Sequence, residues 1–144
     1  ILLYGGVGVG KTQFAKMIAN KAKIDMFEVS FMINDKEAGR EDRLADLNSK
    51  QLVLSKMENS CILFDEAEDV MNGWFWESGK ASKALMNNLL ENTSVPVFWT
   101  TNDIYSVDPA FLRRMTYAIK FEKLSDDVRL RIWEKTLKKN KMKF

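Results

Sequence analysis

The chain has 144 residues, 46% of them apolar, which is typical of one domain with a substantial buried core. Its formal net charge of +2 gives no global reason to expect a nucleic acid or a membrane surface as a partner. The absence of histidine excludes histidine-based triads, histidine acid–base catalysis and the usual zinc sites. Cys61 is the only cysteine, which excludes an intrachain disulfide and favours a reducing, cytoplasmic compartment.

Neither a bilayer-spanning apolar stretch nor a secretory signal is visible in the sequence. The chain begins inside an apolar run without methionine, so we expect it to be part of a longer protein. Its C-terminal end is basic, which favours a solvated helix end whose cations complement the helix dipole and permits a nucleic-acid contact as the alternative. The residues concerned are Lys135, Lys138, Lys139, Lys141 and Lys143.

The first predicted strand, Ile1–Tyr4, leads directly into Gly5–Thr12, which fits the pattern G-x-x-x-x-G-K-[ST]. A helix predicted over Thr12–Lys23 follows, with apolar residues at helical spacing. This strand–loop–helix order indicates a phosphate-binding loop rather than an ordinary glycine-rich turn. The predicted nucleotide-binding residues are Gly5, Gly6, Val7, Gly8, Val9, Gly10, Lys11, Thr12 and Phe14.

The chemistry of this loop follows from its residue types. Glycines let consecutive backbone N–H groups point at phosphate oxygens, and the following helix adds its positive N-terminal dipole. Lys11 can reach the β- and γ-phosphates, and Thr12 offers a hydroxyl group to Mg²⁺.

The later elements continue the alternation of strand and helix. Further strands are predicted at Met26–Phe31, Cys61–Phe64, Val95–Thr100 and Tyr117–Phe121. Further helices are predicted at Glu41–Met57, Glu66–Met71, Lys80–Leu90, Asp108–Arg114 and Ser125–Asn140, and polar loops at Asn34–Arg40 and Gly73–Gly79. Apolar strands separated by helices predict an α/β fold with a parallel sheet covered on both faces, and a ligand at the carboxyl ends of the strands.

Polar residues follow two of these strands. Asp65 ends the apolar run Cys61–Phe64 and can hold Mg²⁺, while Glu66 can polarise a water molecule for attack on the γ-phosphate. Asn102 follows the fourth strand and can bond to phosphate or to the attacking water. The alternatives are acids favoured by a helix dipole at residues 65 and 66, and a turn-forming Asn-Asp pair at 102 and 103.

Together these motifs resemble the core of an AAA+ ATPase of the AAA branch. Gly5–Thr12 resembles Walker A, Ile62–Glu66 resembles Walker B, and Thr101-Asn102 resembles sensor 1. Val107–Arg114 resembles part of the second region of homology. The resemblance implies a three-layer P-loop NTPase fold with a five-stranded parallel sheet, an α/β core over residues 1–124, and the first helix of a helical lid over 125–144.

The resemblance also implies Mg-ATP hydrolysis in a homo-oligomeric ring, expected to be a hexamer. In the family, an arginine after the short helix reaches the neighbouring subunit's nucleotide and stabilises charge in the transition state. Here Arg113 and Arg114 are adjacent, so we expect Arg114 to serve as this finger with Arg113 assisting. A solvent-exposed basic pair is the alternative.

Two loops bear on the partner. Phe31–Asn34 does not match the aromatic–aliphatic–glycine pore motif of the family, which argues against threading of a polypeptide. The segment Gly73–Trp76 contains three large aromatic side chains that can grip a substrate chain, stack on nucleic-acid bases, or pack on the core or a neighbour.

These features give one leading function and several alternatives. We expect coupling of ATP turnover to remodelling of a macromolecular partner, with a protein favoured over a nucleic acid. A nucleic-acid-handling module of the clamp-loader or initiator type is the main alternative. A nucleotide-gated binding module and a P-loop kinase fit less well, because the chain has Glu66 and Asn102.

Overall fold

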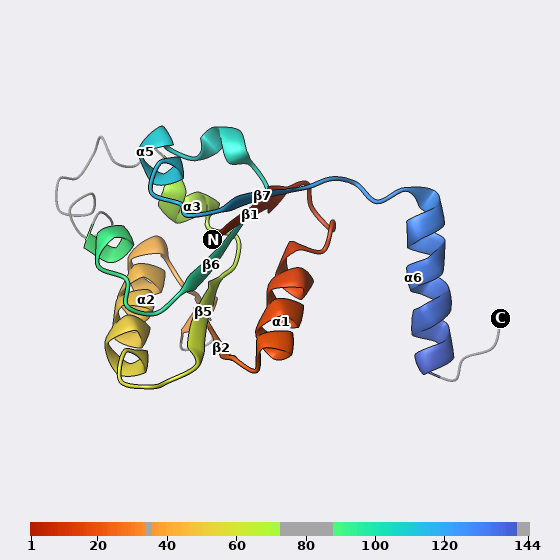
Figure 1. Cartoon of the computed structure of the whole chain (residues 1–144). Helices are drawn as coiled ribbons and strands as arrows, with labels where there is room; N and C mark the ends of the chain where they lie inside the picture. The colour runs from red at the N-terminus through yellow and green to blue at the C-terminus, as the bar shows by residue number, and fades with distance from the viewer. Residues whose placement is uncertain (34–35, 73–87, 141–144) are drawn as a thin grey trace.

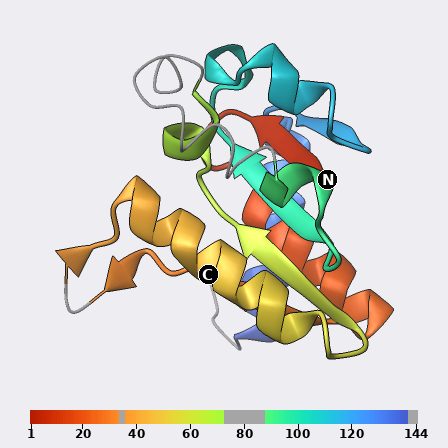
Figure 2. The same ribbon diagram turned by 90° about the vertical axis from the view of Figure 1, so that its left-hand side faces the viewer.

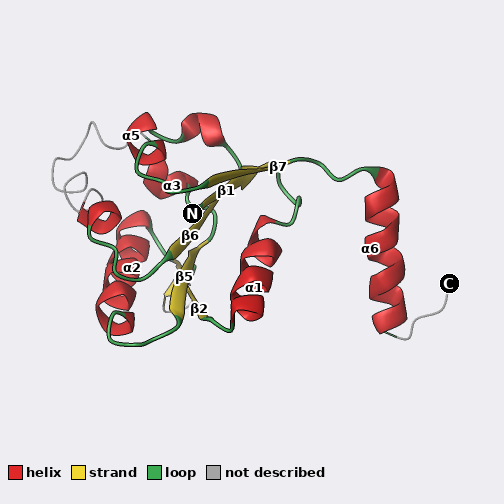
Figure 3. Cartoon of the chain, in the orientation of Figure 1, coloured by secondary structure: helices red, strands yellow, loops and turns green. Residues whose placement is uncertain are grey.

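A central parallel sheet organises the molecule. The computed structural model describes residues 1–33, 36–72 and 88–140. Five parallel strands lie in the order β2-β5-β6-β1-β7, flanked by helices (Figure 3). This confirms the predicted three-layer α/β fold. The strands are β1 (Leu2–Gly5), β2 (Asp25–Glu28), β5 (Ser60–Phe64), β6 (Val97–Thr101) and β7 (Ala118–Phe121).

Neighbouring residues of each inner strand face opposite layers, because side chains alternate along a strand. Leu3 and Leu63 pack in a cluster with Ala15 and Ala19 of helix α1 (Lys11–Ala22) on one face. The other face is covered by α2 (Arg40–Leu54), α3 (Glu68–Met71) and α5 (Pro109–Leu112), as Figure 1 shows. Its core contains Leu2, Leu44, Leu47, Ile62, Phe64, Trp99 and Phe111, all nearly inaccessible to solvent.

The segment after β2 differs from the prediction. The strand ends at Glu28 rather than Phe31, because the Ser30 N–H leaves the sheet and donates to Asp46 Oδ2 at 2.8 Å. The predicted loop Asn34–Arg40 is wrong in part, since β3 (Met32–Ile33) and β4 (Lys36–Glu37) form an antiparallel hairpin. Figure 2 shows this hairpin projecting beside α2.

One local turn departs from expectation, and a second follows β6. The third helix begins at Glu68 rather than Glu66, because Glu66 adopts a left-handed conformation with φ of 48°. After β6, a 3-10 turn at η2 (Ile104–Ser106) follows Asp103, whose carboxylate accepts the Tyr105 N–H at 3.0 Å. Both turns lie at the carboxyl edge of the sheet.

The last helix, α6 (Asp126–Lys139), stands apart from the sheet in Figure 1. None of its described residues is buried, and Leu130, Ile132 and Trp133 are 57%, 49% and 62% exposed. None of the described helices is long and apolar enough to cross a membrane.

Some sequence predictions fall outside the described residues. These are the aromatic segment Gly73–Trp76, most of the predicted helix Lys80–Leu90, and the last basic residues, Lys141 and Lys143. Residues 88–91 are helical, at the end of that predicted helix.

Candidate active site

The carboxyl ends of three neighbouring strands, β1, β6 and β5, meet at one cavity of about 320 Å³. The phosphate-binding loop follows β1, the acidic pair follows β5, and Asn102 follows β6. This is the edge of an open parallel sheet where ligands bind. The lining residues are Val7, Gly8, Gly10, Lys11, Thr12, Gln13, Asp65, Glu66, Thr100 and Asn102.

The backbone of the loop is shaped by its glycines. Gly8 and Gly10 have φ of 75° and 96°, a region that L side chains rarely adopt. Gly10 is the N-cap of α1 and has no side chain that could accept a hydrogen bond from the first turn of the helix. The N–H groups of that turn are therefore available to bind a ligand. The loop and the helix end therefore form a backbone site suited to an anion.

The Lys11 ammonium lies at the centre of the site and is largely withdrawn from solvent. Its Nζ donates to Gly5 O, Gly6 O and Asn102 Oδ1, each at 2.8 Å. Burial lowers the pKa of Lys11 below its ordinary value, and the nearby Glu68, Asp65 and Glu66 carboxylates oppose this shift. An ammonium held in this way is close to the loop amides that would hold phosphate oxygens.

A cluster of oxygen atoms surrounds Asp65. Thr12 Oγ1 donates to Asp65 Oδ1 at 2.8 Å and also lies 3.0 Å from Oδ2. Thr100 Oγ1 donates to Asp65 Oδ1 at 2.5 Å. Hydroxyl and carboxylate oxygens are the ligand types that Mg²⁺ prefers, so Thr12 and Asp65 fit the predicted ion.

Glu66 occupies a strained turn directly after Asp65. A φ of 48° is uncommon for a residue other than glycine; it costs on the order of 1–3 kcal/mol and persists only where the surrounding structure enforces it. Thr100 Oγ1 accepts the Glu66 N–H at 2.9 Å, and Arg43 Nη1 donates to Glu66 O at 3.1 Å. Such strain is characteristic of functional sites.

Several residues at the site were missed by the sequence analysis. Thr100 was expected only as part of a strand, and Arg43 only as part of a helix. Glu68 accepts the Asn102 N–H, and Asp69 pairs with Arg43 at 2.8 Å. No sequence motif identifies these residues, because each one contacts a main-chain group or a side chain that lies more than twenty positions away in the sequence.

The remaining predicted residues do not line the cavity. Phe14 packs edge-on against the Phe121 ring, with 5.2 Å between ring centroids. Arg114 donates from Nη2 to Glu91 Oε1 at 2.9 Å, and Arg113 donates from Nε to Pro109 O at 3.3 Å. Both arginines follow α5, and neither is among the residues that surround Lys11.

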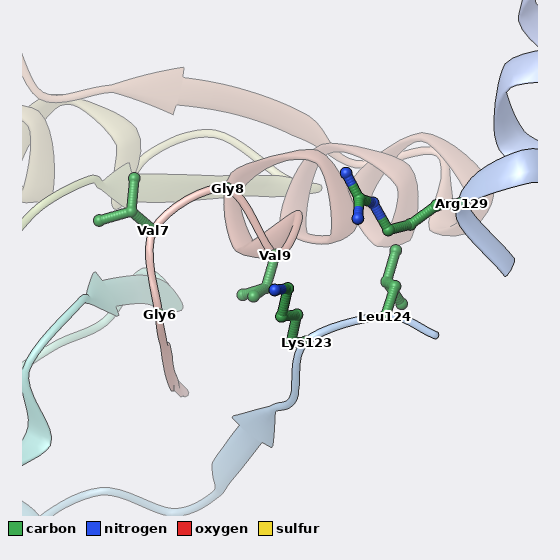
Figure 4. Close-up of a pocket in the computed structure, with 7 residues that line it drawn as sticks. All are labelled: Gly6, Val7, Gly8, Val9, Lys123, Leu124 and Arg129. Atoms are coloured by element: carbon green, nitrogen blue, oxygen red, sulfur yellow. The ribbon is translucent and has the colours of Figure 1, made fainter. Parts of the chain in front are cut away.

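A second hollow, of about 350 Å³, adjoins the first on the far side of the loop. Its lining includes Val7, Val9, Lys123, Leu124 and Arg129, and Figure 4 shows the Val9 side chain directed toward Lys123. The two hollows share Val7 and Gly8, so the phosphate-binding loop forms a wall of each.

The site and the fold agree with the family comparison. Residues 1–123 match the family described as ATPase family associated with various cellular activities (AAA). The chain belongs to this family and is an ATPase domain of the AAA+ class.

The curated relatives include replication factor C large subunits from archaea. The protein of Pyrobaculum aerophilum is 27% identical over 132 residues, which cover 88% of this chain and 29% of the relative. That of Sulfolobus acidocaldarius is 27% identical over 143 residues, covering 99% and 31%. That of Picrophilus torridus is 30% identical over 111 residues, covering 74% and 27%. The chain thus spans less than a third of the length of these relatives.

A solved structure supports the fold. The crystal structure of the FIGL-1 AAA domain in complex with ADP has a TM-score of 0.69 to this chain at 18% identity. The similarity covers 94% of this chain and 47% of that one.

Proposed function

We propose that this chain binds Mg-ATP at the carboxyl edge of the sheet and hydrolyses it, and that turnover drives remodelling of a macromolecular partner. The observation that carries the proposal is one cavity of about 320 Å³ lined by Lys11, Thr12, Asp65, Glu66 and Asn102. Membership of the AAA family supports the same activity.

Each side chain has a role that its chemistry suits. Lys11 and the loop amides would take the phosphate oxygens, with Lys11 exchanging its bonds to Gly5 O and Gly6 O for bonds to phosphate. Glu66 would accept a proton from the attacking water, which Asn102 would help to orient.

The oxygen cluster at Asp65 suits a divalent cation. Thr12 and Asp65 would hold Mg²⁺, directly or through its water shell, once the Thr12 hydroxyl turns away from the carboxylate. When bound, Mg²⁺ would neutralise charge that develops on the phosphates.

The second hollow would receive the nucleoside part of the ligand. Val7, Val9 and Leu124 offer it apolar contacts, and Lys123 and Arg129 add positive charge at its rim. This assignment agrees with a domain organisation in which residues 1–124 form the core and α6 is the first helix of a lid.

The neighbouring subunit would complete the site in a homo-oligomeric ring, which we expect to be hexameric. Arg114 is the proposed finger, and Arg113 would assist it. Arg114 must exchange its bond to Glu91 for the neighbour's nucleotide. Because partly exposed ion pairs contribute only about 0–1 kcal/mol, this exchange costs little.

Two classes of partner are candidates, a protein and a nucleic acid. A protein partner is the leading prediction from the sequence, but the relatives are named replication factor C large subunits, which favours a nucleic-acid-handling module. Stimulation of ATP turnover by DNA, lost steeply as salt rises, would support the nucleic acid. Stimulation by neither DNA nor RNA would favour a protein.

The central experiment replaces the proposed base. Glu66→Gln preserves shape but cannot accept the proton, so ATP should remain bound while turnover falls by about 10²–10⁴-fold. Radiolabelled ATP retention and phosphate release measure the two effects. Glu58→Gln is the matched control, since Glu58 is exposed before β5 and lies outside the cavity. Rapid turnover in Glu66→Gln, equal to that of the control, would refute the role.

A further inference from the structure

Arg43, in the first turn of α2, is a buried cation to which the proposed reaction gives no role. Its side chain is 4% exposed. Nη2 donates to Asp65 O at 2.5 Å, and Nη1 donates to Glu66 O at 3.1 Å. The guanidinium therefore binds the main chain at both acidic residues of the site, from a helix more than twenty positions earlier in the chain.

Other groups fix the guanidinium in this position. Asp69 Oδ1 accepts a bond from Nη1 at 2.8 Å. The guanidinium carbon lies 4.5 Å from the centre of the Phe31 ring and 4.4 Å from that of Phe64, so aromatic rings contact it from strand β5 and from the segment before β3. Phe31 stands at the base of the β3–β4 hairpin, where its carbonyl accepts the Ala38 N–H at 2.7 Å.

These contacts bear directly on the conformation of Glu66. Its N–H is bonded to Thr100 and its carbonyl to Arg43, so both peptide groups that flank its Cα atom are held. The held conformation is the left-handed one, with φ of 48°. Because these dihedral angles set the direction of the Cα–Cβ bond, the same bonds direct the Glu66 side chain.

We propose that Arg43 is a positioning residue for ATP hydrolysis, which holds the Glu66 backbone in the conformation that aims its carboxylate into the nucleotide cavity. Asp69 and Phe31 keep the guanidinium in place. The inference rests on the proposed function, because it assigns to Arg43 a part in the reaction at that site.

The choice of arginine at this position supports the proposal. A planar fork of N–H donors serves two carbonyls and a carboxylate while its faces contact aromatic rings, which neither lysine nor an apolar side chain can do. A buried charge is weak support for stability, since a well-packed apolar residue is often as good. Packing alone therefore does not account for Arg43.

The test uses Arg43→Lys and Arg43→Met in the intact protein. The kcat for Mg-ATP should fall about 10- to 100-fold, because a small displacement of a catalytic group has effects of this size. The Kd of a fluorescent ADP analogue should stay within about twofold, because the phosphate-binding loop is untouched. Lys50→Met is the control: it removes a cation from the same helix, paired with Asp46, and should leave kcat unchanged.

The outcomes separate this inference from the proposed function. An unchanged kcat in folded Arg43 variants, or equal losses of turnover and analogue binding, would overturn the positioning role. If those variants do not fold, Asp69→Asn decides: its side chain is 39% exposed, and we expect kcat to fall about 3- to 10-fold at constant Kd. An unchanged kcat there also overturns the inference. A wild-type protein without Mg-ATP turnover would overturn the proposed function itself.

Discussion

A single hydroxyl group, on Thr100, joins the two acidic residues of the site. It donates to the Asp65 carboxylate and accepts the main-chain N–H of Glu66 at 2.9 Å. Thr100 is 1% exposed, so water does not compete for these bonds. The proposed metal ligand and the proposed base are thereby held by one side chain from the neighbouring strand.

Replacing Thr100 with valine tests this arrangement. The shape is nearly conserved, but Thr100→Val leaves the Glu66 N–H without its acceptor, which should cost about 1–3 kcal/mol of stability. We expect ATP turnover to fall about tenfold or more, because Asp65 and Glu66 both lose a positioning bond. Urea unfolding and phosphate release measure the two effects. Thr101→Val, which removes bonds to Asp103 instead, should reduce turnover less; an equal or larger loss there would contradict the assignment.

The residues of the site differed in how well the sequence revealed them. Asp65 and Glu66 could be predicted to lie near the loop, because an apolar strand delivers them to the same sheet edge as Lys11. Arg43, Thr100 and Glu68 could not be found in this way. Each is an ordinary residue of a helix or strand whose contact depends on packing between distant segments.

At the scale of elements, Gly5 sets how closely β1 and β7 approach. A Cβ atom at Gly5 would lie 2.2 Å from the carbonyl oxygen of Phe121, and its φ of 146° is unfavourable for an L residue. Gly5 therefore serves the sheet as well as the loop that follows it.

Gly5→Ala should therefore destabilise the protein more than Gly6→Ala does. Steric overlap with the β7 backbone and the unfavourable φ together predict a loss of about 2–4 kcal/mol in the free energy of unfolding. A Cβ atom at Gly6 would meet no atom within 4 Å, so Gly6→Ala should change the free energy of unfolding by less than about 1 kcal/mol. Chemical denaturation of the two variants provides the comparison. Equal stabilities would contradict the close approach.

Whether an element could be predicted from the sequence depended on its surroundings in the fold. Cys61–Phe64 was recognised as a strand because every residue of β5 is buried, which gives a continuous apolar run. The strand Lys36–Glu37 could not be predicted in this way, since it is short, both of its residues are exposed, and among the described strands it pairs with β3 alone. The early end of β2 was missed as well, because the Ser30–Asp46 bond that ends it joins distant parts of the chain.

At the scale of the whole molecule, the arginines after α5 lie outside the cavity that holds the other proposed catalytic residues. An arginine in this place does nothing for its own site, so its proposed role requires a neighbouring subunit. Arg113 is exposed and Arg114 is bonded to Glu91, and both follow the same short helix.

Mixing inactive variants tests this division of the site. Arg114→Ala should lower turnover about 10³-fold or more without weakening ATP binding, and Arg113→Ala should have a smaller effect. An Arg114→Ala subunit still has Glu66, and a neighbouring Glu66→Gln subunit still has Arg114, so the interface between them holds one complete site. Random assembly of an equal mixture forms this interface about one time in four, so we expect up to about a quarter of wild-type turnover in a ring. Phosphate release from the mixture measures the recovery. No recovery, with both variants shown to assemble together, would contradict a finger supplied in trans.

The most direct measurement is Mg-ATP turnover per protomer as a function of protein concentration. A site completed by the neighbouring subunit predicts activity that rises steeply with concentration and then saturates as the ring assembles. Turnover per protomer that is constant down to concentrations where the protein is monomeric would contradict the account, because it would show a site complete within one chain.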